Sequence, residues 1–182
     1  MVAFADTACI ASGPLADVAA AAWRRRAEAP MAVVLAFDRA TAQVVELDLR
    51  GSETEVRARY APPAQSPVRR GRPKLGVVAR EVTLLPRHWA WLAEQPGGAS
   101  VALRRLVDAA RQTDAGRVRQ TREVAYRFMS AMAGDLPGFE EAARALFGGD
   151  SRRLEERLLA WPGDIAGEIR RFLDGPQRNA SS

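Results

Sequence analysis

The sequence has little of the chemistry that cross-links a chain or holds a metal. Its 182 residues include a single cysteine, Cys9, and a single histidine, His88. An intrachain disulfide is therefore excluded, and a zinc site of the Cys/His type lacks its ligands. The sequence also lacks an apolar run long enough to cross a bilayer and a secretory signal at its N-terminus. We therefore expect a cytoplasmic protein with no membrane segment and no cofactor.

Lysine is nearly absent, because Lys74 is the only one among 27 basic residues. The formal net charge is +5. A positive balance favours polyanionic partners. The excess is spread along the chain with acidic residues between, and a codon bias toward arginine and alanine is the alternative explanation.

Catalytic motifs are missing as well. The sequence has no phosphate loop, no Gly-x-Ser-x-Gly elbow and no nucleophile–base spacing. Asp38, Glu46 and Asp48 are acidic candidates for a metal or acid–base role, but turn and surface-strand positions account for them. His88 follows Pro86 in a first helical turn without a visible partner, which is typical of a structural histidine. We expect a protein that is not an enzyme.

The pattern of apolar residues predicts an α+β fold that is mostly α. Residues 1–61 predict a small β-α-β-β-α unit, with strands at 8–10, 31–37 and 44–49. Pro14 begins its first helix. Ser52 and Glu55 form a capping box at the start of its second helix, because each side chain can bond to the other residue's backbone amide.

The C-terminal third predicts helices. Residues 113–173 carry apolar stripes at helical spacing, and such stripes are typical of core. A groove for another protein is the alternative. Asp150 and Asp164 are predicted to cap two of these helices. Residues 174–182 are predicted to form a disordered polar tail.

A linker rich in proline and arginine occupies residues 62–75. It contains Arg69, Arg70, Gly71, Arg72, Pro73 and Lys74, which together resemble an AT-hook peptide. Glycine lets the backbone lie on the floor of a narrow A·T-rich minor groove, and proline keeps the peptide extended. The two core arginines would enter the groove, and the flanking basic residues would meet phosphates. An ordinary basic linker is the alternative.

Residues 76–112 resemble the ribbon-helix-helix family of bacterial DNA-binding proteins. That resemblance implies a homodimer in which strand 77–85 pairs with its copy and lies in a major groove. Thr83 would face the groove. Ser100 would cap the second helix and, with Arg104, hold a DNA phosphate. Glu81 departs from the family pattern, because a phosphate repels it.

The same motif predicts which residues form its core. Trp89 and Leu92 would bury the first helix. The second helix would be buried through apolar residues at i, i+3, i+4 and i+7, namely Leu103, Leu106, Val107 and Ala110. A strand and helical hairpin packed on the rest of the chain is the alternative to a ribbon-helix-helix motif.

Three phrases give a wider resemblance: LDLRG at 47–51, GRPKLGVVAREVTLLPRHW at 71–89 and YRFMSAM at 126–132. They are similar to an uncharacterised bacterial family, domain of unknown function 2239, and this resemblance implies no activity.

The sequence therefore predicts a non-enzymatic DNA-binding protein, either a transcriptional regulator or a nucleoid-associated factor. The alternative is a protein-interaction module, antitoxin-like or adaptor, that binds a partner through its C-terminal helices. A large exposed apolar patch on residues 114–173 would favour that alternative.

Overall fold

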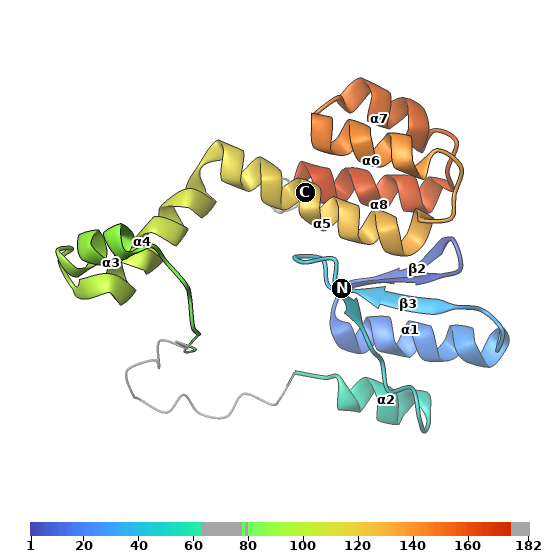
Figure 1. The fold of residues 1–182 in the computed structure, drawn as a ribbon. Helices are drawn as coiled ribbons and strands as arrows, with labels where there is room; N and C mark the ends of the chain where they lie inside the picture. Colours follow the sequence, from blue (N-terminus) through green and yellow to red (C-terminus); the bar gives the residue numbers. More distant parts are fainter. Residues whose placement is uncertain (63–77, 79, 176–182) are drawn as a thin grey trace. The chain divides into compact units, whose positions relative to one another are not determined.

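The computed structural model describes residues 1–62, 78 and 80–175 of the chain (Figure 1). Within them it has four β-strands and eight α-helices, which confirms the α+β, mostly α, prediction. The chain forms two compact units. Residues Met1–Pro62 and Arg119–Ser182 form one, here called the terminal unit, and residues Pro63–Val118 form the inserted unit.

The terminal unit begins with strands and ends with helices. Its first part contains β1 (Val2–Ala5), β2 (Ala8–Ser12), α1 (Leu15–Glu28), β3 (Val34–Phe37), β4 (Val44–Val45) and α2 (Glu53–Arg59). Its last part contains most of α5 (Asp114–Ala133), then α6 (Phe139–Gly148), α7 (Ser151–Leu158) and α8 (Gly163–Asp174). The inserted unit contains α3 (Pro86–Ala93) and α4 (Gly98–Gln112).

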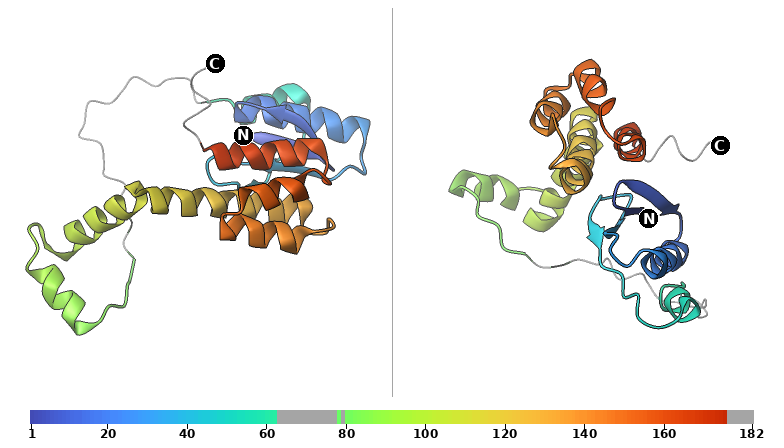
Figure 2. Two further views of the ribbon diagram at one scale, coloured as in Figure 1. Left: turned by 90° about the horizontal axis from the view of Figure 1, so that it is seen from above. Right: turned by 90° about the vertical axis from the view of Figure 1, so that its right-hand side faces the viewer.

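The strands form one antiparallel sheet in the order β2-β1-β3-β4. Helix α1 covers one face, where Ala3 and Ala36 pack against Val18. The C-terminal helices cover the other face (Figures 1 and 2). Because successive strand residues point to opposite faces, a sheet covered on both sides buries all four residues of β1, which are at most 2% exposed.

Aromatic rings join the two ends of the chain in one core. The ring centroids of Phe37 on β3 and Phe128 on α5 lie 5.0 Å apart. The ring of Phe128 lies 5.3 Å from that of Phe4 and 5.2 Å from that of Phe172 on α8. Residues 1–61 and 113–173 were treated as separate regions in the sequence-based division, whereas in the structure most of both belongs to one unit with a common core.

Two details of the predicted strands are wrong. Residues 2–12 form a hairpin of β1 and β2, where the sequence indicated a single short strand at 8–10. The strand predicted at 44–49 ends at Val45. It ends early because the backbone groups of residues 48–51 bond to side chains of α1 and α2 instead of to β3.

The capping predictions are partly confirmed. Ser52 and Glu55 make both bonds of the capping box, and Asp150 accepts a hydrogen bond from the Arg153 amide at 3.0 Å. The prediction for Asp164 is wrong, because Pro162 is the residue that precedes α8. The Asp164 carboxylate instead accepts a hydrogen bond from the Cys9 amide at 2.9 Å, across the sheet edge.

The apolar stripes of the C-terminal helices are core, as predicted. Phe128, Met129 and Ile169 are fully buried, and Leu146 is 3% exposed. Exceptions occur at helix ends, where Phe147 is 48% and Leu159 is 78% exposed. The stripes therefore do not form a groove for another protein. The predicted disordered tail, 174–182, lies outside the described residues from 176 onward.

Candidate nucleic-acid interface

The inserted unit is a helical hairpin preceded by an irregular segment (Figure 1). Pro86 opens α3, as predicted, at the first helical position. Helix α4 begins at Gly98, and Gly97 precedes it with a φ of 87°. Glycine adopts this left-handed conformation without steric cost. The helix therefore starts earlier than the sequence indicated, and the prediction that Ser100 is its cap is wrong.

The predicted strand at 77–85 is not present in the single chain. Val78 and residues 80–85, which are the described part of this segment, belong to no strand. A strand is defined by its hydrogen-bonded neighbour. In a ribbon-helix-helix protein a second chain supplies that neighbour, so a single chain does not test the predicted pairing.

The structure brings together two of the predicted site residues. Arg104 and Ser100 lie one turn apart on α4, and Arg104 Nε donates to the Ser100 carbonyl oxygen at 3.2 Å. Both side chains are exposed, as is Thr83 in the irregular segment. The AT-hook-like residues Arg69, Arg70, Gly71, Arg72, Pro73 and Lys74 lie outside the described residues.

The hairpin leaves most of its apolar side chains exposed. Leu92 on α3 and Ala102 on α4 are the buried residues in the described part of this unit. Trp89 is 42% exposed, so the prediction that it is buried is wrong for the single chain. Leu106 and Val107, on the predicted apolar face of α4, are 49% and 54% exposed. Two short helices cannot enclose these side chains without a further layer.

Positive charge is concentrated in the inserted unit. Residues 63–118 contain ten basic and four acidic side chains, a net charge of +6. The terminal unit contains 17 basic and 18 acidic side chains, a net charge of −1. The impression from the sequence that the excess is spread along the chain is therefore wrong once charges are counted by unit.

The acidic candidates Asp38 and Asp48 have local structural partners. Burial raises the pKa of Asp38, but hydrogen bonds from the Thr41 hydroxyl and nearby amides outweigh it, so the pKa lies below its usual value. The Arg50 side chain, by donating to Asp48, holds the pKa of that carboxyl well below its usual range. A carboxylate with a lowered pKa is a weaker base.

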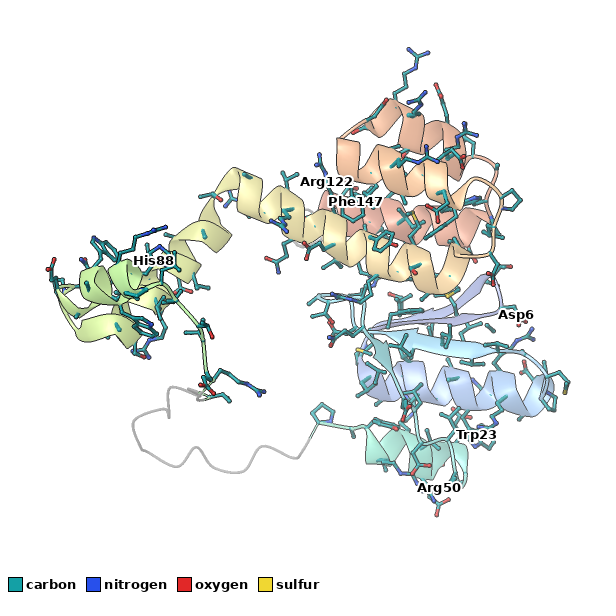
Figure 3. All side chains as sticks on the ribbon, in the orientation of Figure 1. Asp6, Trp23, Arg50, His88, Arg122 and Phe147 are labelled. Carbon is teal, nitrogen blue, oxygen red and sulfur yellow. The ribbon has the colours of Figure 1, made fainter. Side chains whose placement is uncertain are left out.

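Metal and membrane features are likewise not found in the described residues. No group of three or more His, Cys, Asp or Glu side chains there could hold a metal ion. No helix in that part of the chain combines the length and apolar character that a membrane span requires. His88 is exposed on α3 (Figure 3).

Comparisons with known proteins identify a family. No curated protein and no solved structure matches the chain. A family described as "uncharacterized protein conserved in bacteria", DUF2239, matches residues 1–173. Because that match spans nearly the whole sequence, the chain belongs to the DUF2239 family.

Proposed function

We propose that this protein is a non-enzymatic DNA-binding protein whose inserted unit makes the contacts. The supporting observation is the division of charge, with +6 on residues 63–118 and −1 on the rest of the chain. Cationic side chains gathered in one unit release counterions when they meet DNA phosphates, and that release supplies much of the binding free energy. A transcriptional regulator and a nucleoid-associated factor both fit this proposal.

Each predicted site residue has a role in it. Arg70 and Arg72 would enter an A·T-rich minor groove with Gly71 on its floor, while Arg69 and Lys74 meet phosphates. On α4, Ser100 and Arg104 would contact a phosphate near the start of the helix, where the helix dipole favours an anion. Thr83 would face a major groove.

The proposed DNA-binding form is a homodimer. The exposed Trp89, Leu106 and Val107 are apolar side chains of a hairpin too small to bury them. A second copy would cover them and would supply the partner strand for residues 77–85. Dimerisation would also bring two positively charged units onto one duplex, which raises the number of phosphate contacts.

A protein-interaction role through the C-terminal helices is the weaker alternative. It requires an apolar surface on residues 114–173, and the stripes of these helices are buried in the terminal unit. The exposed apolar side chains concentrate on the inserted unit instead.

The proposal is tested by measuring the affinity of the whole protein for A·T-rich and G·C-rich duplexes over a range of salt concentrations. We expect log K to fall steeply with log salt, with a slope of about −0.9 for each phosphate neutralised. We expect the A·T-rich duplex to bind more tightly. An affinity that does not change with salt, or no binding at low salt, would contradict the proposal.

A further inference from the structure

One side of β3 is only half paired. β1 pairs with all four residues of β3, from Val34 to Phe37. β4 pairs with Ala36 and Phe37 alone. In the described part of the chain, Val34 and Leu35 therefore have no strand partner on the β4 side. Backbone amide and carbonyl groups at such an edge are available to another extended chain.

Side chains from α1 and α2 hold the following segment away from this edge. The Tyr60 hydroxyl accepts from the Asp48 amide at 2.5 Å, and Arg59 donates to the Asp48 carbonyl at 2.6 Å. Trp23 Nε1 donates to the Gly51 carbonyl at 2.8 Å (Figure 3). Because these backbone groups are already bonded, the segment does not close onto β3, and the gap is built into the fold.

The gap is a cleft with a volume of about 500 Å³. This lies within the range of roughly 300–1,000 Å³ typical of ligand sites. Its apolar lining comes from both walls: Val34, Leu35 and Ala36 on one side, and Val44, Val45, Leu47 and Leu49 on the other. Arg26 and Glu46 add one charge of each sign. Both are exposed, and neither forms an ion pair within the described chain.

We propose that this cleft binds an extended peptide of a partner protein, which adds a short strand beside Val34 and Leu35. The peptide backbone would complete the hydrogen bonding that β4 leaves unfinished, a common mode of peptide recognition. Alternate apolar side chains of the peptide would pack on Leu47 and Leu49. An acidic peptide side chain would pair with Arg26, and a basic one with Glu46. This site belongs to the terminal unit and does not rest on the proposed DNA binding.

The test uses the full chain and a library of fluorescein-labelled pentapeptide amides. Positions 1, 3 and 5 carry Val, Ile, Leu or Phe, and positions 2 and 4 carry Thr, Glu or Arg. Binding is measured by fluorescence anisotropy, and the tightest peptide is then resynthesised with single backbone N-methyl groups. We expect at least one N-methyl position to weaken binding tenfold or more, because the group removes a backbone donor without changing a side chain.

Variants of the protein locate the site. Val44→Glu places a charge at the cleft on a side chain that is already 50% exposed, so the fold tolerates it, and we expect tenfold weaker binding. Leu159→Glu, at a 78% exposed position elsewhere on the same unit, is the matched control and should bind as the natural chain does. Arg26→Glu should weaken peptides with Glu and strengthen those with Arg.

Three results would overturn the proposal. No library member binds; all N-methylated peptides bind as tightly as the parent, which would indicate an apolar cleft that ignores the backbone; or Val44→Glu and Leu159→Glu bind equally. Circular dichroism of each variant confirms that the fold is kept before its affinity is compared.

Discussion

Glu168 on α8 and Arg39 in the turn between β3 and β4 form an ion pair at 3.0 Å, although 129 residues separate them in sequence. Arg171 donates to the same Glu168 oxygen at 2.9 Å. Glu168 is 1% exposed and is the buried charged residue of the described core. The pair therefore links the N-terminal sheet to the last helix, and it places a charge where the rest of the core is apolar.

Replacing Glu168 should cost more stability than replacing an exposed glutamate. The change Glu168→Gln removes the charge that compensates Arg39 and Arg171, whose side chains are 34% and 58% exposed. Partial hydration of these arginines limits the loss to about 1–3 kcal/mol of unfolding free energy. Urea denaturation followed by circular dichroism measures it.

The control for this change is Glu155→Gln. Glu155 pairs with Arg170 at 2.8 Å, but both side chains are well exposed. Exposed pairs contribute about 0–1 kcal/mol. Equal losses for the two variants would contradict the role assigned to Glu168.

The capping box should make stability depend on pH through Glu55. Hydrogen bonds from the Ser52 amide and hydroxyl hold the pKa of Glu55 below its usual value. Because the pKa is lower in the folded state, this stabilisation is complete above the unfolded pKa, about 4.3. It is lost as the pH falls through the folded pKa. Glu55→Gln should therefore lose less stability between pH 7 and pH 3 than the natural chain, by urea denaturation; an equal loss would contradict it.

The proposed dimer should depend on α4. Leu106→Asp with Val107→Asp places two charges on side chains that are 49% and 54% exposed in the single chain. Analytical ultracentrifugation should find the natural chain as a dimer and this variant as a monomer, since a buried unpaired charge opposes association. Leu159→Asp, on the terminal unit, should remain dimeric. A natural chain that sediments as a monomer at all concentrations would refute the dimer.

The Cys9 thiol should react slowly in the folded protein. Burial, and then the negative charges of Glu168 and Asp164, raise the pKa of the thiol above its ordinary value. Since the thiolate is the reactive form, alkylation by iodoacetamide at pH 8 should be roughly tenfold slower in the folded chain than in urea. Mass spectrometry follows the reaction directly, because Cys9 is the only cysteine. Equal rates would contradict a raised pKa in the folded state.

Local signals predicted much of the fold. The Ser52–Glu55 box, the cap at Asp150 and the opening of α3 by Pro86 depend on residues within one helical turn, and each is confirmed. The apolar stripes of the C-terminal helices also follow from spacing alone. Asp164 has the residue type of a cap but bonds instead to Cys9, 155 residues away, a contact that no local pattern contains.

Long-range features were not predictable in the same way. The division of charge becomes visible only after the unit boundaries are known, because the basic residues of 63–118 lie between two nearly neutral segments of one domain. Glu168 did leave a signal: it occupies the i+3 position of the stripe formed by Ile165, Ile169 and Phe172. An acidic residue inside an apolar stripe indicates a buried partner, here Arg39.

The open edge of β3 is a further case. The alternation of Val45, Leu47 and Leu49 predicts a longer strand, and this pattern is correct for side-chain burial. It does not predict the hydrogen bonds from Tyr60, Arg59 and Trp23 that draw the backbone of 48–51 away from β3. Competition between side chains and a neighbouring strand for the same backbone groups depends on tertiary contacts.

The most direct test of the account compares two double variants that remove the same charge from different units. Arg70→Ala with Arg72→Ala lowers the charge of the inserted unit by two, and Arg152→Ala with Arg153→Ala does the same on exposed positions of the terminal unit. Affinity for an A·T-rich duplex is measured at several salt concentrations. We predict that the first variant binds at least tenfold more weakly with a shallower salt dependence, while the second binds nearly as the natural chain does. Equal effects of the two variants would mean that DNA binding, if observed, follows overall charge and not the inserted unit, and would contradict the central claim.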